Sequence, residues 1–235
     1  MGAAKSLSLK KVKDVKSGYE VPYWWYDIRG FFIFHLSYQD SLFSLVRFFA
    51  KNYSDQHLEV AVGSGSFMEL CLKWRALKNR KSNNPAGIAF DYMPSMLKGA
   101  KAKFGKSSSW KIEVQDVTRM TYPNESFQTI NIANAFHCFS DPQASALELH
   151  RVLKTNGSLA VNVLTPPRGW SLFRRISNKV NAWGKRNHIL VDAIDEAKVK
   201  QIFTSAGFSI TQAEWSGNNL KLKMEKNNFF KQEKV

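Results

Sequence analysis

The sequence predicts an α/β fold built on a doubly wound, seven-stranded sheet, mostly parallel, with an antiparallel hairpin at its C-terminal edge. Three observations predict this fold. Short apolar runs alternate with segments of helical periodicity between residues 58 and 206, as in strands joined by crossover helices. A glycine-rich turn, Gly63-Ser64-Gly65, directly follows the first apolar run. Two strand-like runs then close the chain around a tight turn at 216–218.

The N-terminal part precedes this alternation and has a composition of its own. Residues 1–18 are rich in Lys and Ser, and we expect a mobile basic tail. Residues 19–54 carry many aromatic side chains and then an apolar face at helical spacing, so we expect a helical N-terminal cap. The main domain is expected at 55–235.

The main domain is predicted to contain seven strands and the helices between them. The strands are expected at 58–62, 87–90, 112–114, 129–133, 158–164, 208–215 and 220–224. Helices are expected at 66–79, from Pro94, from Asp141-Pro142 and over 195–206. Since ligands of such sheets bind beyond the carboxyl ends of the strands, we expect the site around Gly63–Gly65, Asp91, Asp116 and Asn134.

Composition and charge limit the class of protein. Hydrophobic residues make up 44% of the 235 residues, enough for a packed core. Lys and Arg number 34 against 19 Asp and Glu, a formal net charge of +15. This balance favours an anionic partner, which could be a small acid, a phosphate, nucleic acid or a membrane surface. Only Cys71 and Cys138 are present, which indicates a reducing, cytoplasmic location. No metal site is expected, because His and Cys do not cluster.

Membrane attachment has two candidate segments. The most apolar stretch, 31–50, is interrupted by polar and charged residues, so no transmembrane span is expected. Residues 1–6 match the N-myristoylation pattern, and a lysine cluster follows. Because so short a motif often arises by chance, a solvated tail is the favoured interpretation. Peripheral membrane contact stays open.

Three features indicate a nucleotide-type cofactor site. Gly63 and Gly65 let the backbone approach a ligand closely, and the following helix offers free N–H groups. Asp91 ends the second strand, where an acid accepts both hydroxyls of a ribose, and Asp116 follows the third strand. A dinucleotide fingerprint would need a small residue at the position of Met68, so NAD is disfavoured.

With these features the chain resembles class I S-adenosylmethionine-dependent methyltransferases, over residues 55–210. The resemblance is to the small-molecule, type 11 branch that includes quinone-biosynthesis enzymes. The motifs agree in order along the chain: His57–Phe67, Gly87–Leu97, Gln115–Val117 with Tyr122-Pro123, Asn134–Phe139 and Arg151–Lys154. The resemblance implies a Rossmann-like methyltransferase domain and S-adenosyl-L-methionine as its cofactor.

The resemblance also implies roles for individual residues. Glu59 would lie near the ammonium group of the cofactor, and Asp91 would accept its ribose hydroxyls. Asp116, with the Val117 amide, would bind the adenine. The complete expected cofactor-binding set is Tyr26, Glu59, Ala61, Gly63, Ser64, Gly65, Asp91, Tyr92, Met93, Asp116, Val117, Asn134 and Ala135.

The chain departs from the family pattern in three places. Ala61 stands where the first motif has a glycine, and its methyl group is expected to weaken cofactor affinity. Gln128 stands where an acid usually follows Phe127. Thr155-Asn156-Gly157 replaces a Pro-Gly-Gly turn, and we expect Asn156 to adopt the left-handed conformation. These departures leave a non-catalytic relative open as an alternative.

The acceptor side is predicted from one histidine and one insertion. His137 follows the fourth strand and is the candidate catalytic base, with His35 and His188 as further options. The insertion at 165–190 is basic and aromatic and contains no acid. Trp170, Arg174 and Arg175 are its candidate acceptor contacts. We expect this insertion to act as a lid that packs on the aromatic cap above the ends of the fourth and fifth strands.

The favoured function is methyl transfer to a small or lipid-like, possibly anionic acceptor. A nucleic-acid (RNA) methyltransferase fits the charge, but the chain lacks a recognition module, so nucleic acid is not the favoured partner. A non-catalytic cofactor-binding or interaction protein of the same fold is the other alternative. The sequence indicates neither an oligomeric state nor the acceptor atom.

Overall fold

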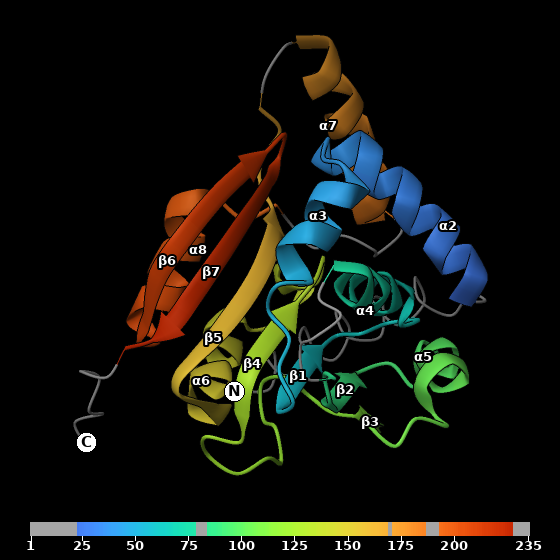
Figure 1. The fold of residues 1–235 in the computed structure, drawn as a ribbon. Helices are drawn as coiled ribbons and strands as arrows, with labels where there is room; N and C mark the ends of the chain where they lie inside the picture. Colours follow the sequence, from blue (N-terminus) through green and yellow to red (C-terminus); the bar gives the residue numbers. More distant parts are fainter. Residues whose placement is uncertain (1–22, 79–83, 169–170, 187–192, 228–235) are drawn as a thin grey trace, which may run out of the picture.

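Figure 1 presents a computed structural model of the chain, which describes residues 23–78, 84–168, 171–186 and 193–227. The expected basic tail, 1–18, lies outside the described residues. A single seven-stranded sheet has the strand order β3-β2-β1-β4-β5-β7-β6. The strand order reverses between the neighbouring central strands β1 and β4. The carboxyl ends of these two strands are therefore the switch point, where ligands of such sheets bind. The predicted fold class, a mostly parallel Rossmann-like sheet, is confirmed.

Five strands pair with one another in parallel, and β7 alone runs opposite to the other six strands. The parallel strands are β1 (His57–Val60), β2 (Gly87–Asp91), β3 (Trp110–Val114), β4 (Phe127–Ile132) and β5 (Leu153–Leu164). The hairpin of β6 (Phe208–Ser216) and β7 (Asn219–Lys226) pairs with β5 through β7. The predicted antiparallel C-terminal edge is therefore confirmed.

Helices cover both faces of the sheet. On one face lie α3 (Leu42–Phe49), α4 (Ser66–Lys78) and α5 (Leu97–Phe104), which bury Phe49, Met68 and Phe104 in one hydrophobic cluster. On the other face lie α6 (Pro142–Val152) and α8 (Glu196–Ser205), which bury Leu149 and Phe203 in a second cluster. The two clusters are what the alternating apolar runs predict for a sheet buried on both sides.

Three further elements lie at the carboxyl end of the parallel strands. These are α2 (Tyr23–Ile33), the π-helix η1 (Phe34–Tyr38) and α7 (Ser171–Arg186), which share one end of the molecule (Figure 1). The Ser177 hydroxyl on α7 donates to the Leu36 carbonyl at 3.0 Å and accepts from the Gln39 amide at 2.7 Å. The expected packing of the insertion on the N-terminal segment is therefore confirmed for α7 and η1.

A buried carboxylate ties this end of the chain to the edge hairpin. Asp40 accepts hydrogen bonds from the Ser216 hydroxyl at 2.5 Å and from the Asn219 amide at 2.8 Å. The ammonium of Lys221 lies 3.6 Å from the same carboxylate, and both side chains are buried. Because a buried charge that loses its partner is costly, Asp40 holds the segment after η1 in a defined place.

Several boundaries differ from those expected. β5 begins at Leu153, directly after α6, five residues before the expected start. Asn156 has the expected left-handed conformation, with a φ of 61°. The helix expected from Pro94 begins at Leu97, after a turn. Within the described ranges, no helix is long and apolar enough to cross a membrane.

Candidate functional site

The glycine loop between β1 and α4 is bonded to the acid that ends β2. Gly63 and Gly65 have φ values of 57° and 77°, and Ala61 also has a positive φ, 55°. The Gly63 amide donates to Asp91 Oδ2 at 2.9 Å, and the Met93 amide donates to Asp91 Oδ1 at 2.9 Å. Removal from water raises the pKa of Asp91 above its usual range, although these amides oppose the shift. Asp91 thus fixes the loop to the end of β2.

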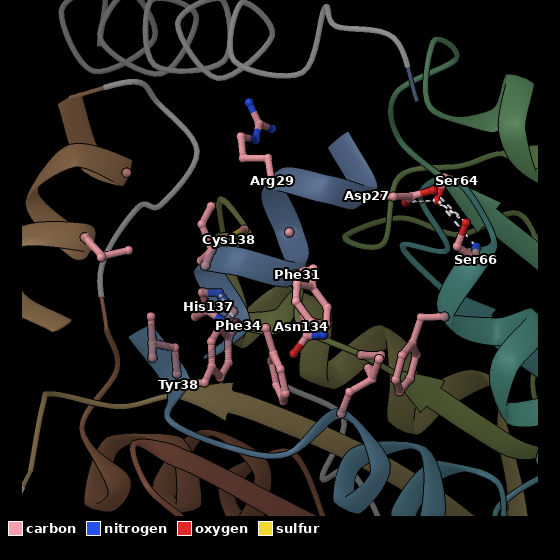
Figure 2. A pocket seen from close by; sticks show the side chains of 18 of the residues that line it. Asp27, Arg29, Phe31, Phe34, Tyr38, Ser64, Ser66, Asn134, His137 and Cys138 are labelled. Carbon is pink, nitrogen blue, oxygen red and sulfur yellow. Dashed lines mark hydrogen bonds between the residues drawn. The ribbon is translucent and has the colours of Figure 1, made fainter. Parts of the chain in front are cut away.

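A second carboxylate binds the same loop from above. Asp27 on α2 accepts hydrogen bonds from the Ser64 hydroxyl at 2.5 Å and from the Ser66 hydroxyl at 2.7 Å, as Figure 2 shows. Asp27 is not among the site residues that the sequence predicts, although it directly follows Tyr26, which is one of them. The side chain of Tyr26 lies outside the described part of α2.

A cavity of about 320 Å³ lies between the glycine loop, α2, η1 and α7. Its volume is at the lower end of the range for small-molecule sites. Its walls are mainly apolar, with Phe31, Phe34, Phe67 and Leu70 among them. The polar groups include Asp27 and the three expected site residues Ser64, Asn134 and His137 (Figure 2).

His137 is buried in the cavity wall, on the short 3-10 helix η2 (Phe136–Cys138). Its Nε2 lies 3.0 Å from the hydroxyl of Tyr38, whereas its Nδ1 has no hydrogen-bond partner among the described residues. Burial lowers the pKa of His137 from 6.5 to about 4, so the imidazole is neutral at pH 7. The imidazole is thus neutral and keeps one ring nitrogen without a hydrogen bond in the described structure.

Asn134 and Ala135 follow β4 and continue the site. Asn134 has a φ of 55°, and its backbone amide donates to Asn162 Oδ1 at 2.8 Å. Asn162 returns the bond by donating to Asn134 Oδ1 at 2.7 Å. The Ala135 carbonyl accepts from the Cys138 amide at 2.7 Å. These bonds fix the turn after β4 next to the cavity.

The residues expected around the adenine lie outside the cavity lining. Tyr92 and Met93 follow β2, and the Tyr92 side chain is exposed. Asp116 follows β3 and accepts from the amide and hydroxyl of Thr118, at 2.9 and 2.7 Å. Val117 is half-buried against the main core. All four belong to the loops that leave the carboxyl ends of β2 and β3.

Glu59 is buried inside β1 and does not line the cavity. Its Oε2 accepts a hydrogen bond from the Tyr53 hydroxyl at 2.8 Å and lies 3.1 Å from Nε2 of His57. In the structure the carboxylate of Glu59 thus contacts Tyr53 and His57 within the protein core. A contact with an ammonium group of the cofactor stays a prediction.

Of the acceptor residues expected on the insertion, the structure describes only Arg174 and Arg175. Trp170 and His188 lie outside the described residues. Arg174 and Arg175 are exposed on α7 and do not line the cavity. Instead α7 contributes Val180, Asn181 and Gly184 to the cavity wall, which the sequence does not predict because only the tertiary fold decides which side of α7 faces the cavity.

His35 on η1 is exposed, and its Nδ1 lies 2.8 Å from the Phe31 carbonyl on the preceding helix, α2. Across the described ranges, no three His, Cys, Asp or Glu side chains are grouped so as to hold a metal ion.

The strand order and the place of the glycine loop define a class of protein, the Rossmann-like methyltransferase fold. A solved putative methyltransferase from Bacillus halodurans has the same fold, with a TM-score of 0.61. The two are 16% identical, and the similarity covers 79% of this chain and 98% of that chain. At this identity the comparison shows the fold alone.

Sequence comparison then shows what part of the chain is similar to. Residues 58–161 match the methyltransferase domain family. The demethylmenaquinone methyltransferase of Deinococcus radiodurans is 34% identical over 111 residues, 47% of this chain and 43% of that protein. The enzyme of the same name from Chlamydia muridarum is 27% identical over 133 residues, 57% of this chain and 52% of that protein. The chain spans about half the length of these relatives.

Residues 58–161 thus have the sequence of a methyltransferase domain, and S-adenosyl-L-methionine is the cofactor of such domains. Both expectations from the sequence are confirmed. The described residues fit this cofactor. Each carboxylate oxygen of Asp91 has a second acceptor position beside the one that a loop amide occupies, so ribose hydroxyls can still bind. His137, whose Nδ1 is buried without a hydrogen-bond partner among the described residues, is part of the wall of the adjoining cavity.

Proposed function

We propose that this protein transfers a methyl group from S-adenosyl-L-methionine to a small or lipid-like, anionic acceptor bound in the cavity beside the glycine loop. The observation that carries this proposal is the buried, neutral His137 in the wall of a mainly apolar cavity next to Ser64. The relatives named as demethylmenaquinone methyltransferases add support for an aromatic, lipid-like acceptor.

The cofactor would be held by residues at the carboxyl ends of three strands. In this proposal Asp91 accepts the ribose hydroxyls, and Ala61, Gly63, Ser64 and Gly65 lie along the methionine part. Further contacts come from Tyr26, Glu59, Tyr92, Met93, Asp116, Val117, Asn134 and Ala135. The cofactor supplies an activated methyl group, so the protein mainly aligns the acceptor and excludes water.

His137 would act as the general base. An acceptor hydroxyl must lose its proton as the new bond to the methyl carbon forms. When Nε2 carries the hydrogen and donates it to the Tyr38 oxygen, the lone pair of Nδ1 is free to accept that proton. With the Tyr38 hydroxyl as the acceptor, the imidazole is in the tautomer that the reaction needs.

The elements above the cavity would control access. We propose that residues 19–54 form a cap on the methyltransferase domain, 55–235, and that the insertion at 165–190 is a lid. The hydrogen bonds from Ser177 to η1 support a lid that moves together with the cap. A cytoplasmic location also stays a proposal, which the two free thiols of Cys71 and Cys138 support.

The test is release of S-adenosylhomocysteine from S-adenosylmethionine in the presence of a panel of quinols, phenolic acids, fatty acids and phospholipids. We expect turnover with at least one of them, and a loss of at least about 100-fold in His137→Phe with cofactor affinity unchanged. His35→Phe is the matched control and should retain full activity. Cofactor binding without turnover would indicate a non-catalytic relative, and turnover with RNA alone would refute the small acceptor.

A further inference from the structure

The exposed side of α7 carries an apolar stripe. Leu172, Ile176 and Trp183 are 64%, 36% and 41% exposed. At about 100° per residue, these three positions fall within about 40° of one another around the helix axis. The opposite side of the helix is buried through Ser177 and Asn181, which bond to η1 and its neighbours. The stripe therefore faces away from the protein.

A second apolar stripe lies on α2 and η1. Trp25, Ile28, Phe32 and Leu36 are between 44% and 58% exposed. With Phe31 and the stripe on α7, they make up eight of the fourteen large hydrophobic side chains that are exposed in the described part of the chain. A concentration of this kind at one end of a molecule marks an interaction surface rather than ordinary surface variation.

Positive charge accompanies the apolar stripes. Five side chains of α7 are basic and exposed, and the helix contains no acid: Arg174, Arg175, Lys179, Lys185 and Arg186. Lys179 and Arg186 run along one side of the apolar stripe. The acid of α2, Asp27, is turned inward to Ser64 and Ser66. The surface made by α2, η1 and α7, here called the docking surface, thus combines apolar and cationic side chains.

This combination distinguishes between partners. RNA binds cations and stacks on aromatic rings, but exposed aliphatic side chains such as Leu172 and Ile176 contribute little to it. An anionic bilayer takes aliphatic and aromatic side chains into its interface while its headgroups attract Lys and Arg. We propose that the docking surface binds an anionic lipid bilayer.

Docking would set the cavity against the membrane. Phe31 of α2 and Val180 and Gly184 of α7 belong both to the elements of the docking surface and to the cavity wall. A lipid-like ligand could then enter the cavity without crossing water. The binding itself requires neither cofactor nor acceptor, so it goes beyond the proposed function and can be tested separately.

The experiment is sedimentation of the full chain with vesicles of phosphatidylcholine alone or with phosphatidylglycerol, without cofactor. We expect binding to the anionic vesicles that salt weakens. We expect two double variants each to lower the affinity for anionic vesicles at least about tenfold. Leu172→Gln/Ile176→Gln removes apolar area that would be buried in the bilayer interface. Lys179→Glu/Arg186→Glu reverses two basic residues, each of which contributes about fivefold near such a surface. Circular dichroism and thermal melting check that the variants fold.

Matched controls come from the opposite end of the sheet and from its helices. Leu77→Gln/Leu147→Gln removes two exposed apolar side chains, and Lys51→Glu/Lys106→Glu reverses two exposed lysines that precede β1 and β3. Both should bind like the wild type, since every variant keeps the same basic N-terminal residues. Equal losses in controls and docking-surface variants would overturn the proposal. So would absence of vesicle binding, or binding to RNA that only the charge reversal weakens.

Discussion

The hydroxyl of Tyr38 lies 3.0 Å from Nε2 of His137, and both side chains are buried at the wall of the cavity. The two residues are far apart in the sequence and meet because η1 lies over the carboxyl end of β4. This pair leaves Nδ1 as the imidazole nitrogen without a partner in the described structure. A buried imidazole held in this way has consequences for stability as well as for catalysis.

The first prediction concerns stability in acid. The pKa of His137 is lowered from 6.5 to about 4 in the folded protein, so the unfolded chain binds a proton more readily between these values. Stability is therefore complete above pH 6.5 and declines as the pH falls toward 4. We expect His137 to account for about 2 kcal/mol of the stability lost between pH 7 and pH 4.5.

Urea unfolding of wild type and His137→Gln at both pH values measures this contribution. The variant should lose less stability than the wild type on acidification. The pKa values of His57 and His150 are also lowered by burial, but both residues are present in each protein and cancel in the comparison. Equal losses in the two proteins would show that His137 is not the group that titrates.

The second prediction concerns Asp91. Asp91→Ala removes the acceptor for the Gly63 and Met93 amides as well as the acceptor proposed for the ribose. We expect affinity for S-adenosylhomocysteine to fall at least about tenfold by calorimetry, because a hydrogen bond to a charged group contributes about 1.5–3 kcal/mol. Asp141→Ala, which removes a helix cap at α6, should leave the affinity unchanged. An unaltered affinity in Asp91→Ala would contradict the assignment.

The third prediction concerns Ala61, whose positive φ of 55° strains any residue with a Cβ. Ala61→Gly should relieve this strain and remove the methyl group from the glycine loop. We expect tighter binding of S-adenosylhomocysteine with little loss of stability. Asn156→Gly relaxes a similar φ, 61°, in the turn before the paired part of β5, so it should change stability alone. The same affinity change in both variants would count against a local effect at Ala61.

The fourth prediction concerns the bonds between α2 and the glycine loop. Asp27→Asn keeps the shape of the side chain but replaces two charge-assisted hydrogen bonds to Ser64 and Ser66 with neutral ones. We expect faster amide hydrogen exchange in α2 without a change in exchange of the central strands. Asp195→Asn, at the cap of α8, is the control and should not alter exchange in α2.

Local patterns predicted the sheet well because each strand carries its own apolar run. Leu58, Ile130 and Val161 lie in strands that are buried on both sides, and the short clusters of apolar residues in these strands mark them in the sequence. The start of β5 at Leu153 could not be predicted, because Thr155 and Asn156 have turn-like side chains within the strand. There the register between β4 and β5 shifts, and Asn156 keeps a left-handed, turn-like conformation within the strand.

The features of the candidate site also fall into two groups, those that the sequence predicts and those that it does not. The glycine loop and Asp91 could be predicted, since both are tied to strand ends that the sequence marks. The inward turn of Asp27 and the Tyr38–His137 contact could not, because each joins segments that only the tertiary fold brings together. The buried pair of Asp40 and Lys221 is a further example, since a charged side chain in the sequence normally indicates a surface position.

The last prediction returns to Arg174 and Arg175. The sequence predicts that they contact the acceptor, but both side chains are exposed and do not line the cavity. Their effect on a soluble acceptor should then come from long-range attraction, which draws anions toward the cavity and is screened by salt.

We expect Arg174→Glu/Arg175→Glu to raise the KM of an anionic acceptor severalfold at low salt, while kcat and cofactor affinity stay the same. At high salt the KM values of variant and wild type should converge, whereas a direct bidentate clamp would keep them apart and lower kcat as well. The measurement is a KM series at several salt concentrations with a water-soluble anionic acceptor and a neutral analogue. An equal rise in KM for the neutral analogue would refute both electrostatic interpretations.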